Sequence, residues 1–134
     1  MITRTIFIQD WKATFLVSID GDDHLAVLQA LADCNPPDAI LERVAESLDD
    51  NHPNSGFTFS NTRRRESIIY VSPTTSGGEF ISTFFHELTH LVCDICLTDG
   101  ISLRGEEIAY LAGNIAHQLS DILCRLSCDH CRNK

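Results

Sequence analysis

The chain has few glycines and prolines and lacks any long apolar run. Its 134 residues include 7 Gly and 4 Pro, which is too few for a collagen-like or Pro/Gly-rich disordered protein. No stretch approaches the roughly 18 consecutive apolar residues of a membrane-spanning helix. Residues 1–7 also lack the apolar segment and small-residue cleavage site of a secretion signal. We therefore expect a cytoplasmic protein with no membrane partner.

Positive charge is scarce as well. Ten Lys and Arg stand against 19 Asp and Glu, so the net charge is −9. Binding to a phosphate backbone needs clustered Lys and Arg, and the one basic run, at residues 63–65, lies in a polar segment typical of a hairpin tip. We therefore expect no nucleic-acid partner. The length and the 43% apolar content predict a single domain, residues 1–134, with one core.

The residue pattern predicts a small α+β domain. β-branched and aromatic residues predict a first hairpin of two strands and two later strands. Apolar residues at helical spacing predict four helices, the last two joined by a short loop at 97–105. The expected strands cover 3–8, 13–19, 56–60 and 67–72, and the expected helices begin near 24, 37, 77 and 106. We expect a small, mostly antiparallel sheet packed on helices. A short loop favours antiparallel neighbours, so the last two helices should form an antiparallel pair.

One short motif carries the chemistry. Residues 84–92 read Phe-Phe-His-Glu-Leu-Thr-His-Leu-Val, which contains His-Glu-x-x-His, a zinc-binding pattern when it lies on a helix. His86 and His90 are four residues apart and share one helix face. Glu87 is rotated from His86 by about 100°, where it can act as general base for a water activated by the metal. The motif predicts His86 and His90 as zinc ligands and Glu87 as the catalytic residue.

The surrounding residues favour a helix that is largely buried. Ser76 and Glu79 suit the first turn of a helix, and apolar residues then recur at spacings of three and four. These residues are Ile81, Phe84, Phe85, Leu88, Leu91, Val92 and Ile95. The histidines are expected on the shoulder of this apolar stripe. The alternative is a pair of ordinary helix histidines whose hydrogen bonds are satisfied by neighbours.

A catalytic zinc usually has three protein ligands, and the residues leave several candidates for the third. Cys96 lies about 240° from His90 if the helix continues, and would face away from the metal. Glu106 and Glu107 begin the next helix, and an antiparallel partner helix brings its first turn beside the motif helix. One of these acids can bind the metal while the other stabilises the helix N-terminus.

Residues 86–94 resemble the motif helix of thermolysin-like neutral proteases, including Asp94 four residues after the second histidine. The helix from residue 106 resembles that of compact gluzincins: the minigluzincins, the ImmA/IrrE group and small metallopeptidase-like proteins of phages and mobile elements. The resemblance covers about residues 68–120 in the order of elements. It implies a minimal zincin-like fold, one zinc ion per chain and Glu107 as the third ligand, followed by Ala109-Tyr110, with Glu106 as the alternative.

The resemblance leaves the remaining positions of a zincin site open. Asp94 is a candidate acceptor for a histidine N–H or an ordinary surface acid. Thermolysin-like enzymes have an Asp where this chain has Leu111, so Asn114 is the candidate for orienting His86. Tyr110 and His117 are candidates for stabilising an oxyanion. The alternative is that Tyr110 is an ordinary, partly buried tyrosine and His117 an ordinary surface histidine.

The resemblance also assigns a place to the strand before the motif helix. In gluzincins that strand forms the upper edge of the cleft and pairs with an extended peptide. Residues 67–72 would take this role, with a plain core strand as the alternative.

Six cysteines are many for a chain without an export signal, and we expect them to be reduced. Cys93-x-x-Cys96 and Cys128-x-x-Cys131 suggest a four-cysteine zinc site, but antiparallel helices place the pairs about 30 Å apart. Two other arrangements stay open. The tail cysteines could form a closed site with His130, or one of them could block the catalytic zinc. Free, partly buried thiols are the simplest interpretation.

These observations together predict a zinc-dependent metallopeptidase that hydrolyses a protein or peptide substrate. A chain of 134 residues leaves little room for a deep cleft, so a protein partner is the expected source of specificity. The alternative is a catalytically weak or inactive zincin-like protein that holds zinc and acts as a regulatory or binding module.

Overall fold

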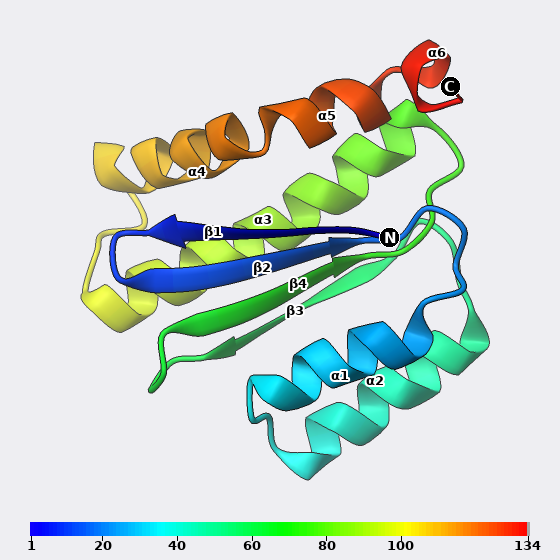
Figure 1. The fold of residues 1–134 in the computed structure, drawn as a ribbon. Coiled ribbons are helices and arrows are strands. Elements are labelled where there is room, and N and C mark those ends of the chain that lie inside the picture. Colours follow the sequence, from blue (N-terminus) through cyan, green and yellow to red (C-terminus); the bar gives the residue numbers. More distant parts are fainter. Residues whose placement is uncertain (134) are drawn as a thin grey trace.

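A computed structural model describes residues 1–133 and shows a mixed four-stranded sheet between two helical layers (Figure 1). The strands lie in the order β1-β2-β4-β3. Their bounds are β1 Ile2–Ile8, β2 Trp11–Val17, β3 Gly56–Asn61 and β4 Glu66–Val71. All four strands agree with the sequence-based expectation to within about two residues, and the α+β class is confirmed.

Two of the three strand pairings are antiparallel. β1 and β2 form the expected hairpin, with Ile8 paired to Trp11 across a tight turn at Gln9, whose φ is 57°. β3 and β4 are also antiparallel, whereas β2 and β4 run parallel. β4 therefore has a partner on each side. The expectation that residues 67–72 form a sheet edge is wrong, because β3 occupies that edge.

The two faces of the sheet carry separate cores. Alternation along β2 and β4 sends Leu16 and Tyr70 to one face and Phe15 and Ile69 to the other. The first face is covered by α1 (His24–Asp33) and α2 (Asp38–Asp50), and the second by α3 together with α4 and α5 (Figure 1). The candidate motif lies in this second layer.

The motif helix, α3, spans Gly77–Asp99. The hydroxyl of Ser76 accepts a hydrogen bond from the amide of Glu79 (3.1 Å), which confirms the predicted start. The helix ends at Gly100, whose φ of 68° suits glycine, so it extends past residue 97, where we expected a loop. Ile81 and Phe85 were expected in the apolar stripe but are 41% and 43% exposed, because they lie outside the sheet-facing side of the helix.

The last predicted helix, 106–126, is divided in two. α4 spans Glu106–Gln118 and α5 spans Ser120–Ser127, followed by the short α6, Asp129–Arg132. The amide of Leu119 is shared between the carbonyls of Ile115 and Ala116, each at 3.2 Å, where the helical ladder shifts. Leu119 is fully buried, so the break keeps the apolar sides of both halves on the core. α4 and α5 run antiparallel to α3, as expected (Figure 1).

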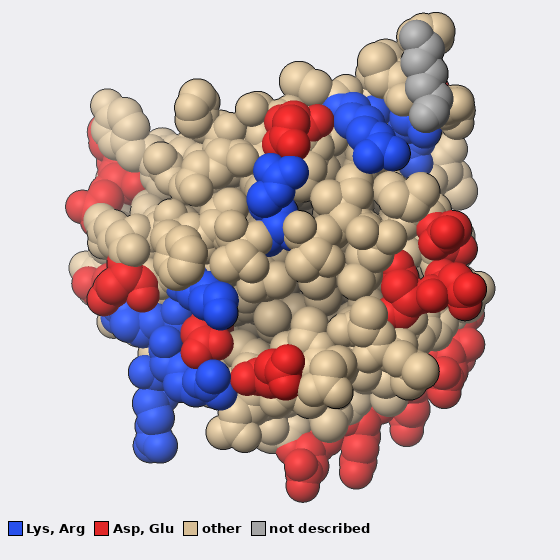
Figure 2. Space-filling model, viewed as in Figure 1, with Lys and Arg blue, Asp and Glu red and all other residues tan. Residues whose placement is uncertain are grey.

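α3 is long and apolar enough to cross a membrane by length and composition, but half of its most apolar window is buried within the fold, as in a core helix. Figure 2 shows acidic side chains along the margin that carries the α1–α2 layer, while Lys and Arg form separate small groups on the same view. This face therefore has no continuous basic stripe.

Candidate metal centre

His86 and His90 lie on successive turns of α3, on its solvent-exposed side. Their ring centroids are 5.0 Å apart and the ring planes are inclined by 72°. This arrangement follows directly from the four-residue spacing on a helix. Two imidazoles that are open to solvent and one turn apart fit two of the ligand positions of a zinc ion. They are more exposed than the predicted shoulder position implied.

Glu87, in contrast to the two exposed histidines, is buried and only 5% exposed. Its side chain lies between α3 and the edge strand β3. The hydroxyl of Thr58 donates a hydrogen bond to Glu87 Oε1 (2.8 Å) and also lies 3.1 Å from the Glu87 carbonyl oxygen. An ionised carboxylate has about four acceptor sites, so Thr58 fixes the side chain and leaves capacity for another donor.

Gly56 explains how β3 lies so close to Glu87. A Cβ built at Gly56 would overlap the backbone carbonyl oxygen of Tyr70 and would lie 3.2 Å from Glu87 Cγ. Backbone atoms of a paired strand cannot yield to such an overlap, so only glycine fits here without a shift. The start of β3 is thus shaped to receive the Glu87 side chain.

Asp94 lies two turns after Glu87 on the same side of α3, and Ser60 of β3 lies 2.6 Å from its Oδ2. Ser60 also contacts Ser67 (2.7 Å), which accepts from the indole N–H of Trp11 (2.9 Å). An indole only donates and an ionised carboxylate only accepts, so the hydroxyls donate in order from Ser67 to Ser60 to Asp94. Asp94 is an acceptor, as expected, but its partner is Ser60.

The β3 side of the centre was not among the residues predicted from the sequence. Thr58 and Ser60 point towards the carboxylates of α3, whereas Phe57 and Phe59 pack on the α1–α2 side. The signal was present as a strict alternation of aromatic and hydroxyl residues over 57–60. It became interpretable only when the partner helix was known.

Glu107, the predicted third ligand, lies in the first turn of α4. It lines a hollow between α4 and the β1–β2 hairpin, together with Tyr110, Asn114 and His117. Within residues 1–133, no three His, Cys, Asp or Glu side chains gather closely enough to hold a metal. His86, Glu87 and His90 are near neighbours on α3, whereas Glu107 and the exposed Glu106 begin α4 and do not complete a three-ligand group with the histidines. Glu107 as third ligand stays a prediction.

The other candidates on α4 are engaged or exposed in the same hollow. Asn114 accepts a hydrogen bond from Gln118 of its own helix (2.8 Å) and lines the same hollow as Glu107, and its role in orienting His86 stays a prediction. Tyr110 is 74% exposed. α3 and α4 meet instead across an apolar groove that Val92, Ile108 and Ala112 help to line.

The cysteines also divide by environment. All six are free. Cys34 and Cys96 are buried, and burial raises the pKa of each thiol above its ordinary value. Cys96 is fully buried in the core, which agrees with the expectation that it faces away from the metal. Cys124, Cys128 and Cys131 are exposed near the C-terminus.

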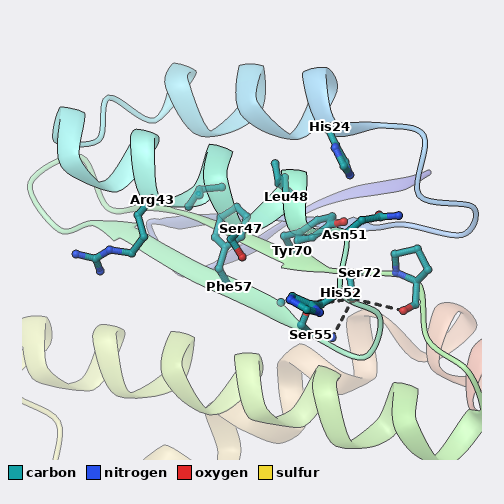
Figure 3. A pocket seen from close by; sticks show the side chains of 13 residues that line it. His24, Arg43, Ser47, Leu48, Asn51, His52, Ser55, Phe57, Tyr70 and Ser72 are labelled. Carbon is teal, nitrogen blue, oxygen red and sulfur yellow. Dashed lines mark hydrogen bonds between the residues drawn. The ribbon is translucent and has the colours of Figure 1, made fainter.

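A second hollow lies on the other face of the sheet, between α2 and β3–β4 (Figure 3). Its volume is about 150 Å³. The rings of Phe57 and Tyr70, 5.5 Å apart, form its floor, while His24 points towards it from α1 and the guanidinium of Arg43 points away. Gly56 lines this hollow, and a Cβ built on it would lie 3.2 Å from Glu87 Cγ, so the same glycine borders both the hollow and the Glu87 side chain.

Comparison with known proteins finds no family model, curated protein or solved structure that matches the chain. The resemblance to compact gluzincins therefore depends on the motif residues themselves.

Proposed function

We propose that this protein is a zinc-dependent peptidase of compact gluzincin type. One observation carries the proposal. The exposed rings of His86 and His90 lie 5.0 Å apart on α3, and the intervening Glu87 is held against the edge strand of the sheet. An ordinary pair of surface histidines does not need a buried acid between them. This combination of donors and acid is what metal-assisted hydrolysis uses.

Each residue then has a distinct role. His86 and His90 would hold the ion through their imidazole nitrogens. Zinc would polarise a carbonyl and lower the pKa of water. The Glu87 carboxylate would accept a proton from the attacking water and pass it to the leaving amine. Thr58 would orient that carboxylate through its 2.8 Å hydrogen bond.

The substrate class follows from the edge strand. Within the described residues 1–133, β3 pairs with a strand on one side only, so its other edge presents backbone N–H and C=O groups. An extended peptide can pair with such an edge, and β3 passes directly beside Glu87. We therefore propose an extended protein or peptide segment as substrate, with the edge role transferred from residues 67–72 to β3.

Zinc affinity tests the metal centre, measured by competition with a chromophoric chelator. His86→Ala and His90→Ala should each lower the affinity strongly, whereas His24→Ala, on the other face of the sheet, should leave it unchanged. Equal zinc affinities in all three variants would contradict the proposed metal centre. The same assay on Glu107→Ala and Glu106→Ala tests the third ligand, since the resemblance predicts a loss confined to Glu107→Ala.

Cleavage of a denatured peptide library tests the reaction. Glu87→Gln preserves the size of the side chain and an oxygen that accepts from Thr58, so it should fold and bind zinc but lose cleavage. A Glu87→Gln variant that cleaves as fast as the wild type would assign the activity to a contaminant.

A regulatory or binding protein that holds zinc is the second candidate. It is favoured by the burial of Glu87, which ties α3 to β3 whether or not any reaction occurs. Under this alternative, wild type and Glu87→Gln bind zinc equally and neither cleaves any peptide in the library.

A further inference from the structure

The two Cys-x-x-Cys pairs of the sequence have different backbone settings. Cys93 and Cys96 both lie inside α3, whereas Cys128 precedes α6 and Cys131 lies within it. The metal centre uses neither pair. Because the spacing is identical, the structural setting alone decides what each pair can do.

The pair in α3 is poorly placed for a disulfide. Residues three apart in a continuous helix have Cβ atoms about 5–6 Å apart, while a disulfide needs roughly 3.5–4.5 Å. Cys96 is also fully buried, and burial raises the pKa of its thiol. A buried thiol of raised pKa is a weak nucleophile.

The tail pair differs on each point. Cys128 has extended backbone angles, with φ −101° and ψ 119°, so helical geometry does not fix its side chain. Both thiols are exposed. The Cys128 sulfur makes no standard capping hydrogen bond to α6, but the nearby amide and thiol of Cys131 lower the pKa of the Cys128 thiol. Cys128 in turn raises the pKa of Cys131.

The turn that holds these thiols is fastened to the start of α3. Asp129, between the two cysteines, accepts a hydrogen bond from the amide of Gly77 (2.6 Å). Arg132 donates to the carbonyls of Thr74 (2.6 Å) and Leu126 (2.8 Å). These contacts anchor the turn to the start of α3, so the dithiol does not lie on a loose tail, which reduces the entropy lost on closing the ring.

We propose that Cys128 and Cys131 form a surface dithiol that undergoes thiol–disulfide exchange with small disulfides. The Cys128 thiolate attacks one sulfur of a disulfide RSSR, forming a mixed disulfide and releasing RS⁻. Cys131 then loses its proton and attacks the Cys128 sulfur, forming the Cys128–Cys131 bond and releasing the second RS⁻. The dithiol is oxidised by two electrons and RSSR is reduced to two thiols. This site does not depend on the proposed peptidase function.

Glutathione disulfide is the probe, applied to the reduced full-length protein. Intact mass and peptide mapping should show the loss of two hydrogens on the segment that contains residues 128 and 131. Cys131→Ser should stop at a glutathione adduct on Cys128, and Cys128→Ser should lose the closure. Cys93→Ser and Cys124→Ser are matched controls that should close as the wild type does.

Three results would overturn the assignment. They are a wild-type adduct that never closes, a bond that joins Cys124 to either tail thiol, and Cys131→Ser protein without an adduct on Cys128. Thermal unfolding of each variant, compared with the wild type, separates lost reactivity from lost folding. Serine at an exposed position should leave the unfolding midpoint within experimental error.

Discussion

The hydroxyl of Thr58 on β3 donates a 2.8 Å hydrogen bond to the carboxylate of Glu87 on α3. Glu87 is the one charged residue among the buried side chains of residues 1–133. Burying a carboxylate is costly unless it is hydrogen-bonded. The acid that the motif assigns to catalysis is thus also the acid that joins the histidine helix to the sheet edge.

Thr58→Val removes this hydrogen bond while keeping the shape of the side chain. A buried charged acceptor that loses its donor costs ~1–3 kcal/mol, so the midpoint of urea unfolding should fall with an unchanged slope. Thr5→Val is the control, because the Thr5–Thr14 hydroxyl contact is exposed and should be worth less than about 0.5 kcal/mol. Equal losses of unfolding free energy in the two variants would show that the Thr58 hydrogen bond contributes no more than an exposed one.

Gly56→Ala should destabilise the fold by ~1–3 kcal/mol. The new methyl group would meet the Tyr70 carbonyl and Glu87 Cγ, and neither β4 nor α3 can shift freely. Gly113→Ala should act in the opposite direction. A Cβ built there, on α4, meets no atom of residues 1–133 within 4 Å, and alanine favours a helix over glycine by about 1 kcal/mol. Thermal unfolding of both variants checks the contrast, and a stabilised Gly56→Ala would contradict the close approach of β3 to α3.

Arg4 of β1 donates to both carboxylate oxygens of Asp121 on α5, at 3.1 and 2.8 Å. This hydrogen bonding holds the pKa of Asp121 below its usual range. For a lowered pKa, the stabilisation is present above the unfolded value of about 3.9 and is lost as the pH falls through the folded value. In Arg4→Gln, the NMR titration midpoint of Asp121 should therefore rise. Arg104→Gln removes a distant positive charge and should leave the midpoint unchanged.

Ser67→Ala should also destabilise the protein, because the indole N–H of the fully buried Trp11 loses its acceptor. The expected cost is ~1–3 kcal/mol. Circular dichroism can follow unfolding of this variant, of Trp11→Phe and of the double variant. The double variant should lose less than the sum of the single changes, since the orphaned donor is gone. Strict additivity would show that the indole and hydroxyl are not coupled.

Much of the local structure was predictable from the sequence. The β-branched and aromatic residues of 3–8 and 13–19 predicted the hairpin, and the serine cap at Ser76 predicted the start of α3. Helical periodicity alone placed His86 and His90 one turn apart with Glu87 beside them. These features depend on neighbours within a few residues, so their physical causes are contained in short segments.

The break at Leu119 was not predictable in this way. Residues 106–126 keep one apolar periodicity throughout and contain no proline. Leu119 is fully buried where the helix divides, and residues of both halves belong to the same core cluster, which is a property of the assembled layers.

The sequence by itself determined the histidine pair, the acid between them and the strands that form the sheet. Only the tertiary structure decided that β3, rather than β4, lies at the sheet edge beside Glu87, and that Glu107 lines a hollow away from the histidines. Strand order and the separation of two helices depend on contacts between residues far apart in the chain. Local periodicity carries no information about those contacts, so Thr58 and Gly56 became recognisable as partners of Glu87 only in the folded protein.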